Sequence, residues 1–96
     1  MNGMRFAWDE AKAAENRHKH GVSFEGASAV FADENARLKH DPDHSQKEDR
    51  FLLLGFSATL RLLIVCHAYR ENDEVIRIIS ARKATPSERR QYGSYI

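Results

Sequence analysis

The amino-acid sequence predicts one α+β domain over residues 1–96: a small antiparallel β-meander, two N-terminal helices and a short C-terminal helix. Three observations indicate this fold class. Two capped helical segments occupy the first third, three apolar runs typical of strands follow, and a capping box stands near the C-terminus. A chain of 96 residues, 42% of them hydrophobic, suffices for one modest core.

The first third of the chain carries clear start and stop signals. Residues 5–8 alternate polar and apolar side chains, which predicts a short strand. Asp9 is placed to cap a helix over residues 10–20, and Gly21 ends it. Ser23 caps a second helix.

The second half of the chain predicts the sheet. Polar residues 33–49 indicate a loop, with a short strand at residues 37–40. The apolar runs then predict three strands, over residues 51–56, 60–69 and 75–82. A capping box begins the last helix and consists of Thr85, Pro86 at the first helical position, and Glu88.

Alternation along residues 60–69 predicts which side chains share a sheet face. One set is wholly apolar and is expected to face the helices: Leu60, Leu62, Ile64 and Cys66. The less apolar face then carries Arg61 and His67. Cys66 is the only cysteine, so we expect a buried neutral thiol and no disulfide.

The turn at residues 70–74 sets the register of the last strand. One-to-one pairing across it places His67 opposite Arg77, and Arg61 joins them in a cationic cluster. Alternation separates Arg77 from Arg82, so we expect the two arginines on opposite faces. Arg82, at the strand end, would have to reach into the site from there.

Charge is unevenly distributed along the chain although the net charge is only +1. Residues 33–49 hold six acidic and three basic side chains, whereas residues 75–96 hold five basic and one acidic. This pattern suggests a local anionic partner, and a solvated helix face is the alternative. With no signal-peptide core and no apolar run long enough to span a membrane, we expect a cytoplasmic protein.

The sequence contains the groups needed to cleave RNA without a metal ion. That reaction needs a base, an acid and cations for the transition state. The candidate proton-transfer groups are Asp43, His44, Glu48 and His67, and the candidate cations are Arg50, Arg61, Arg77, Arg82 and Lys83. Ordinary surface charge, or ion pairing with the acidic loop, is the alternative interpretation of the arginines.

The segment from His40 to His44 could instead be a metal site, because it contains two histidines and two carboxylates. No cysteine cluster or His-Glu-x-x-His helix accompanies it, and Pro42 stiffens the loop. A solvated turn is therefore the preferred interpretation, and a metal-dependent nuclease remains an alternative.

Several stretches together resemble the BrnT toxin family, in order and over nearly the whole chain. They are Phe6-Ala7-Trp8-Asp9-Glu10-Ala11-Lys12, Lys19-His20-Gly21-Val22-Ser23-Phe24-Glu25, Val30-Phe31-Ala32-Asp33, Asp43-His44-Ser45 with Glu48 and Arg50, residues 76–85, and Glu88-Arg89-Arg90-Gln91-Tyr92. One departure is visible: many relatives carry glycine in the turn before the arginine that matches Arg61, and Thr59-Leu60 stands here.

The resemblance implies a RelE-like fold and a metal-independent ribonuclease that needs no cofactor and arrests translation. It also implies neutralisation by a BrnA-type antitoxin with a ribbon-helix-helix end, operator DNA binding only through that antitoxin, and a toxin homodimer within a heterotetramer. A different class of function is the alternative: a non-catalytic binding module, derived from such a toxin, that serves as corepressor.

The resemblance also implies the site. Glu48 is then the base or a positioning group, His44 the acid, and Arg50, Arg77 and Arg82 bind the phosphate. Asp43 and Lys83 are the other expected contacts to RNA, and the sheet-face argument adds Arg61 and His67.

Overall fold

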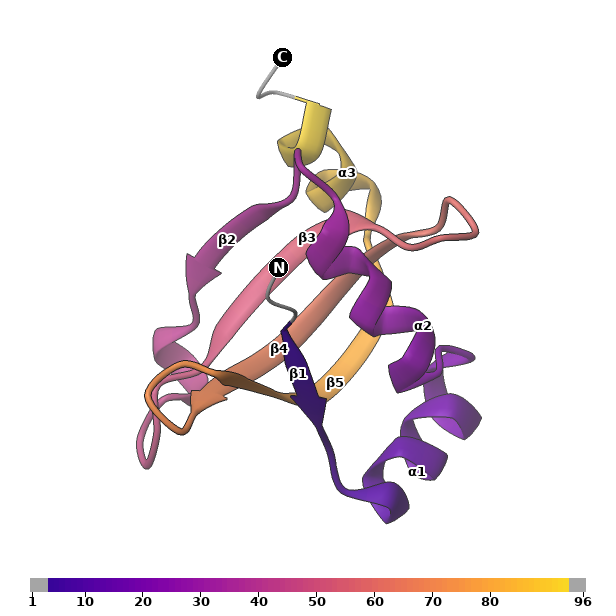
Figure 1. Cartoon of the computed structure of the whole chain (residues 1–96). Coiled ribbons are helices and arrows are strands. Elements are labelled where there is room, and N and C mark those ends of the chain that lie inside the picture. Colours follow the sequence, from indigo (N-terminus) through magenta and orange to yellow (C-terminus); the bar gives the residue numbers. More distant parts are fainter. Residues whose placement is uncertain (1–3, 94–96) are drawn as a thin grey trace.

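Five strands form one curved sheet in the order β1-β5-β4-β3-β2. The structure, a computed structural model, describes residues 4–93. Its elements are β1 (Arg5–Ala7), α1 (Glu10–His20), α2 (Phe24–Ser28), the 3-10 helix η1 (Ala29–Ala32), β2 (Arg37–His40), the 3-10 helix η2 (Pro42–His44), β3 (Phe51–Phe56), β4 (Leu62–Arg70), β5 (Val75–Lys83) and α3 (Pro86–Gly93) (Figure 1). The α+β class and the element order are confirmed.

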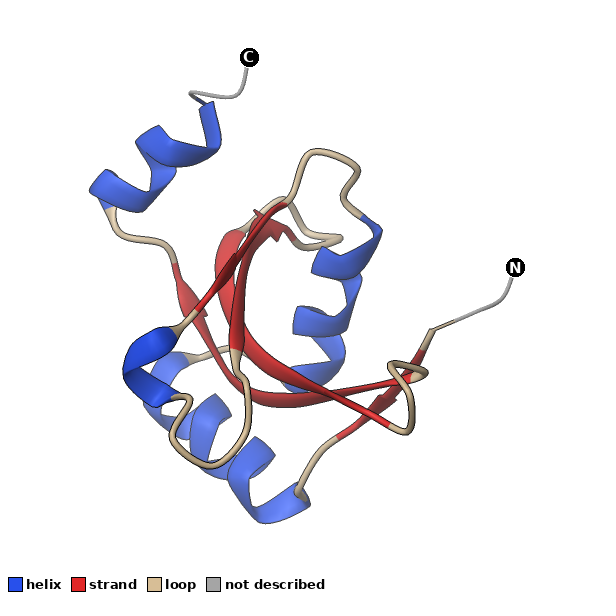
Figure 2. Cartoon of the chain, turned by 90° about the vertical axis from the view of Figure 1, so that its left-hand side faces the viewer, coloured by secondary structure: helices blue, strands red, loops and turns tan. Residues whose placement is uncertain are grey.

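The sheet is mixed rather than wholly antiparallel. Strands β2 to β5 form the expected meander, whereas β1 pairs in parallel with β5, with Phe6 opposite Ile76. Three residues of alternating polarity predict a strand but not its partner, so the parallel edge was not predicted. Figure 2 shows the sheet curving around α2 and η1, with α3 outside the curve near the C-terminus.

The predicted caps hold the first helices. The side chain of Asp9 accepts from the backbone N–H of Lys12 at 3.0 Å, and Gly21 ends α1 with φ of 70°. The side chain of Ser23 accepts from the backbone N–H of Gly26 at 2.9 Å. Within residues 4–93, no helix is long and apolar enough to cross a membrane.

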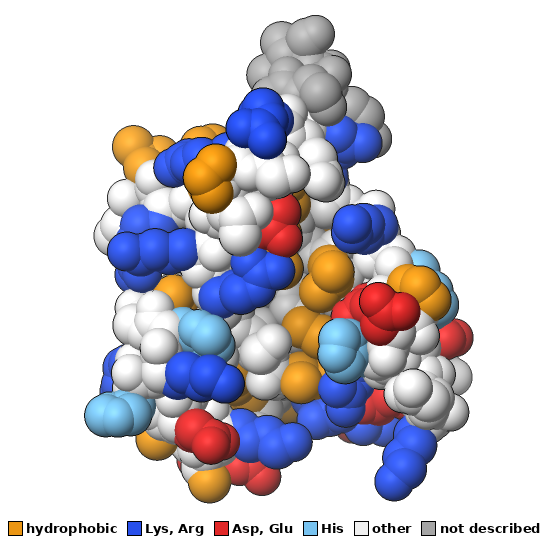
Figure 3. All heavy atoms as spheres, turned by 180° about the vertical axis from the view of Figure 1, so that it is seen from behind, with side chains coloured by type: hydrophobic (Ala, Val, Ile, Leu, Met, Phe, Trp, Pro, Cys, Tyr) orange, Lys and Arg blue, Asp and Glu red, His pale blue; other side chains and the backbone are white. Residues whose placement is uncertain are grey.

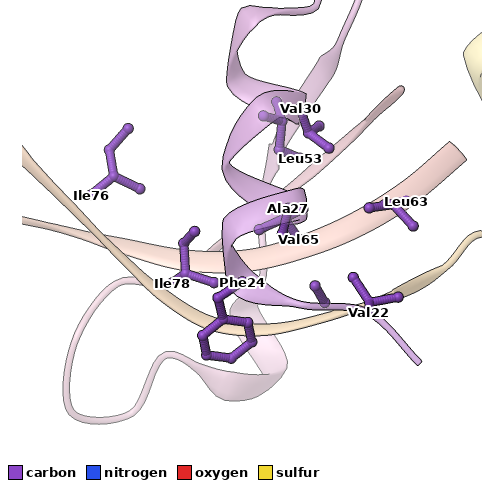
Figure 4. Packing of buried hydrophobic residues seen from close by; sticks show 10 residues of the cluster. Val22, Phe24, Ala27, Val30, Leu53, Leu63, Val65, Ile76 and Ile78 are labelled. Atoms are coloured by element: carbon purple, nitrogen blue, oxygen red, sulfur yellow. The ribbon is translucent and has the colours of Figure 1, made fainter. Parts of the chain in front are cut away.

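The main core lies between the sheet and α1 and α2, which we call the helix face. Its strand residues include Leu63 and Val65 of β4 and Ile78 of β5, which pack against Phe24 and Val30 (Figure 4). The expectation that Leu60, Leu62, Ile64 and Cys66 would face the helices was wrong, because Leu60 is exposed in the turn before β4 and the other three lie on the loop face. Because β4 is covered on both faces, both sets are apolar and alternation cannot tell them apart.

Asn16 joins α1 to the sheet inside this core. It is 6% exposed, and its Nδ2 donates to the carbonyls of Val22 at 2.9 Å and Ala81 at 2.8 Å. Its Oδ1 accepts from the backbone N–H of Ala81 at 3.1 Å. A single side chain therefore satisfies three buried backbone groups.

A β-bulge in β5 reverses the side-chain alternation. Cys66 pairs with Ser80, but the next residue, His67, pairs with Ile78, so Ile79 is an extra residue on β5. Such an insertion changes the face on which the following side chains lie. The predicted pairing of His67 with Arg77 was wrong for a separate reason: across the turn Tyr69 pairs with Ile76 rather than with Val75, which already shifts the register by one residue.

The bulge brings two separated arginines to one face. Arg77 pairs with Ala68 and Arg82 with Ile64, and both partners are even-numbered residues of β4. Side chains of directly paired residues lie on the same side of a sheet. The expectation that Arg77 and Arg82 lie on opposite faces was wrong, and both belong to the face opposite α1 and α2, which we call the loop face.

Candidate active site

The loop face carries a cleft of about 370 Å3, which we call the main cleft. Its lining residues are Asp41, Asp43, His44, Arg50, Leu52, Ile64, Cys66, Ile79, Ser80 and Arg82. Figure 3 shows this face, with hydrophobic side chains at the hollow and mostly Lys, Arg and His around it. The floor is a packed sheet, so the charged groups stand on a rigid base.

The loop at residues 41–50 is folded back on itself by its own hydrogen bonds. The backbone N–H of Asp41 donates to the carbonyl of Arg50 at 2.8 Å. The hydroxyl of Ser45 donates to the Asp41 carbonyl at 2.6 Å and accepts from the Arg50 N–H at 3.0 Å. These bonds fix the ends of the loop, and thereby the side chains that it presents.

A histidine–carboxylate pair stands at the edge of the main cleft. Nδ1 of His44 lies 2.9 Å from Oδ2 of Asp41. The Asp41 side chain is only 11% exposed, whereas that of His44 is 67% exposed. A buried carboxylate thus orients an accessible imidazole, and Nε2 points away from it.

Glu48 binds three arginines. Arg77 donates to its Oε2, Arg70 Nη2 lies 2.8 Å from Oε1, and Arg50 Nε lies 3.5 Å from Oε2. Burial opposes ionisation of this carboxyl, but the three guanidinium charges, Arg77 foremost, outweigh it and lower the pKa of Glu48. The cluster retains a net positive charge.

Arg82 is held by α3. Its two terminal nitrogens bind the carboxylate of Glu88 at 2.8 and 2.9 Å. These hydrogen bonds lower the pKa of Glu88 from 4.5 to about 2. Glu88 also accepts from the Thr85 N–H at 2.8 Å, so the predicted capping box is confirmed and anchors the arginine as well.

Comparison with known families decides the identity of this fold. The family model described as the ribonuclease toxin, BrnT, of type II toxin–antitoxin systems matches residues 8–88. The chain belongs to the BrnT family of ribonuclease toxins. Its antitoxin partner and its RNA substrate follow from that family in general terms.

The fold agrees with a solved BrnT structure. The crystal structure of the Brucella abortus ribonuclease toxin, BrnT, is similar with a TM-score of 0.65 and 26% identity, over 86% of this chain and 99% of that one. No curated protein matches the sequence. The matched range of the BrnT family includes all residues of the main cleft.

His67, an expected RNA contact, is instead a core residue of this BrnT fold. It is fully buried on the helix face, with its ring 4.8 Å from that of Phe31. Its ring nitrogens lie 3.1 Å from the Val65 carbonyl and 3.2 Å from the Tyr69 hydroxyl. Burial lowers its pKa, so the imidazole stays neutral. The predicted cationic cluster around it was wrong.

Arg61 and Lys83 also lie away from the main cleft. Arg61 Nη2 donates to the carbonyl of Gly21 at 3.2 Å, which binds it to the end of α1. Lys83 pairs with Leu63, so its side chain leaves β5 on the helix face, opposite to Arg82. The structure thus unites Asp43, His44, Arg50 and Arg82 at the cleft, with Glu48 and Arg77 beside them, but not these two residues.

Two residues of the BrnT site were not predicted in their roles. Arg70 was assigned only to a polar turn, but it is the last residue of β4 and contacts Glu48. Asp41 appeared only in the metal alternative, yet it orients His44. His40 pairs instead with Asp49 at 3.2 Å. Among residues 4–93, no three His, Cys, Asp or Glu side chains gather as metal ligands would.

Proposed function

We propose that this toxin cleaves RNA at the main cleft without a metal ion, with arginine side chains carrying the positive charge that the reaction needs. The observation that carries the proposal is the oriented His44–Asp41 pair in the same cleft as Arg50 and Arg82. A proton donor and cations for one phosphate thus meet at one place. These are the groups that phosphodiester cleavage requires.

The arginines are proposed to bind the scissile phosphate. A guanidinium has five N–H donors in a fork that matches phosphate oxygens, and Arg82 keeps part of this set while bound to Glu88. Arg50 lines the cleft as well, and Arg77 lies on the same face because of the bulge. Charge that develops on the phosphate is stabilised most where such donors are fixed beforehand.

His44 is proposed to protonate the leaving 5′-oxygen. The cleaved bond joins phosphorus to that oxygen, while the ribose 2′-oxygen attacks the phosphorus from the other side. Asp41 holds the ring through Nδ1, which leaves Nε2 for the substrate. Asp43 lines the same cleft and is proposed to take the proton of the 2′-hydroxyl as that oxygen forms its bond to phosphorus.

Glu48 is proposed as a positioning residue rather than as the base. Its lowered pKa keeps it ionised and makes it a weak proton acceptor. Its carboxylate instead fixes Arg50 and Arg77 relative to each other. Of the two roles that the sequence left open, the three ion pairs favour positioning.

The partner is proposed to be a BrnA-type antitoxin with a ribbon-helix-helix end. Family membership supports this proposal. The same reasoning extends to a heterotetramer built on a toxin homodimer, in which the antitoxin contacts operator DNA.

The test is cleavage of RNA by the purified chain in the presence of EDTA. We expect cleavage to persist, and Arg82→Ala to reduce kcat about 100-fold, the usual cost of one fixed donor. Arg90→Ala, an exposed position on α3 outside the main cleft, is the control. Thermal melting of each variant confirms folding.

Two results contradict the proposal. Loss of cleavage in EDTA, restored by a divalent ion, would point to a metal-dependent nuclease. Absence of cleavage by a folded chain that still completes an antitoxin–operator complex would point to a corepressor.

A further inference from the structure

A second hollow adjoins the main cleft, and neither the sequence nor the family assigns it a role. It measures about 550 Å3 and is lined by Glu48, Asp49, Phe51, Tyr69, Arg70 and Asp73. We call it the aromatic pocket. It lies where β3 begins and β4 ends.

The aromatic pocket and the main cleft are connected by shared residues. A third hollow between them shares His44 and Arg50 with the main cleft and Glu48 with the aromatic pocket. The three hollows therefore follow the loop at residues 41–50 as one track. Phe51 and Tyr69 belong to the helix face, because Phe51 pairs with His67 and Tyr69 with Ile76, so the track passes from the main cleft around the end of the sheet.

Two half-buried rings give the pocket its apolar wall. The centroids of Phe51 and Tyr69 lie 5.4 Å apart at 64°. Both rings rest on the buried imidazole of His67, and the Tyr69 hydroxyl is bound to its Nε2 at 3.2 Å. The wall is thus fixed from beneath, as a stacking platform for a base requires.

The pocket also has a carboxylate that no neighbour neutralises. Glu48 is bound by arginines and Asp49 by His40. Within residues 4–93 the Asp73 carboxylate forms no ion pair or hydrogen bond, and its charge raises the pKa of Tyr69, where burial acts in the same direction.

Asp73 stands on an unusual turn. Glu71, Asn72 and Asp73 adopt φ of 53°, 57° and 68°, a left-handed run that is uncommon for residues other than glycine. Arg5 ties this turn to β1 through Glu71 at 3.2 Å and Glu74 at 3.8 Å. Strained backbone that neighbours hold in place often marks a functional position.

We propose that the aromatic pocket binds one base of the RNA substrate, and that Asp73 makes guanine the preferred base. Guanine presents two adjacent N–H donors, at N1 and N2, which one carboxylate accepts together. Uracil presents one donor. Phe51 and Tyr69 supply stacking for any base, and Asp73 supplies the preference. This inference rests on the proposed RNA cleavage.

The test compares short RNAs that carry one guanine in a uridine background with all-uridine RNA. We expect wild-type KM to be about tenfold lower for the guanine-containing RNA, the discrimination typical of one bidentate base contact. In Asp73→Asn, which keeps a side chain tolerant of the left-handed turn, the two substrates should share one KM. Replacing guanosine by inosine, which lacks the N2 amino group, should remove most of the preference of the wild type.

Glu74→Gln is the matched control, because it removes the same charge from the same turn outside the pocket. It should keep the guanine preference. Phe51→Leu should raise KM about tenfold for every RNA, as loss of one stacked base does. If Phe51→Leu does not fold, the surface change Asp73→Asn still tests the proposal.

A binding measurement tests the aromatic pocket independently of the proposed RNA cleavage. Fluorescence anisotropy with the Arg82→Ala chain measures Kd for both RNAs at short times, while its slowed cleavage leaves the RNA intact. A guanine preference that Asp73→Asn abolishes supports the pocket even if the wild type cleaves nothing. Equal affinity and equal KM for both RNAs overturn it. So does a Phe51→Leu chain that binds RNA normally but loses the antitoxin, because the pocket would then hold a protein side chain.

Discussion

The two faces of the sheet use the same residue types for different ends. On the helix face His67 is fully buried and neutral, held by a carbonyl and a tyrosine hydroxyl. On the loop face His44 is two-thirds exposed and is held by a carboxylate. The difference teaches that the surroundings of a histidine, more than its residue type, decide whether its ring is closed into the core or open to a ligand.

The two faces also differ in the polar interactions that stabilise them. The helix face is closed by neutral hydrogen bonds from Asn16, all of them buried. The loop face is closed by ion pairs of Glu48 and Glu88, which stay partly open to water. We therefore expect substitutions on the helix face to cost stability, and those on the loop face to alter cleavage or the response to pH.

The largest effect on stability is expected from Asn16→Ala. It leaves the N–H and carbonyl of Ala81 and the carbonyl of Val22 buried without partners, which costs about 3 kcal/mol of unfolding free energy. Urea denaturation measures this loss. Glu15→Ala, an exposed neighbour on α1, is the control and should change little. A cost below about 1 kcal/mol for Asn16→Ala would break the contrast between the faces.

A smaller and pH-dependent effect is expected from Glu88→Gln. The folded pKa of about 2 lies below the ordinary 4.5, so the ionised Glu88 stabilises the fold above pH 4.5 and loses this effect as pH falls toward 2. Because the Arg82 side chain is 40% exposed, water screens the ion pair. We therefore expect Glu88→Gln to lower the unfolding free energy at neutral pH by about 2 kcal/mol, less than the whole pKa shift of Glu88 would give.

Denaturation curves at several pH values test this prediction. The gap between wild type and Glu88→Gln should narrow steadily as pH falls below 4.5. A gap that stays constant with pH would mean that the cap to Thr85, not the charge, is what the variant loses.

The smallest effect is expected from Arg61→Ala. Its guanidinium donates to the Gly21 carbonyl near α1 and not to the main cleft. We expect a loss of about 0.5 kcal/mol in stability and RNA cleavage within twofold of wild type. A tenfold fall in kcat would contradict this prediction and would indicate that Arg61 contacts the RNA.

Local signals in the sequence predicted the elements well. Asp9, Gly21, Ser23 and the capping box at Thr85 act through neighbours within a few residues, so the sequence contains the whole interaction. The parallel pairing of β1 with β5 is non-local, and three residues hold too little pattern to specify it.

The candidate site was predicted as a set of residues better than as an arrangement. His44, Glu48, Arg50 and Arg82 do gather around one loop and strand. His67 was misplaced because alternation showed which side chains share a face of β4, but not which of its two covered faces carries the cleft. The ion pairs of Glu48 with Arg77 and of Glu88 with Arg82 join side chains from different elements, so composition alone could not assign them.

The extra residue Ile79 has a consequence for how this site is inherited. Arg77 and Arg82 are five positions apart, an odd interval that sends side chains to opposite sides of a regular strand. With Ile79 left out of the pairing, the interval becomes even, and both arginines lie on the loop face. Exchanging Ile79 for another side chain preserves this count, whereas deleting any single residue between the arginines turns one of them away. The placement of both arginines on the loop face thus depends on the number of residues between them as well as on their chemistry.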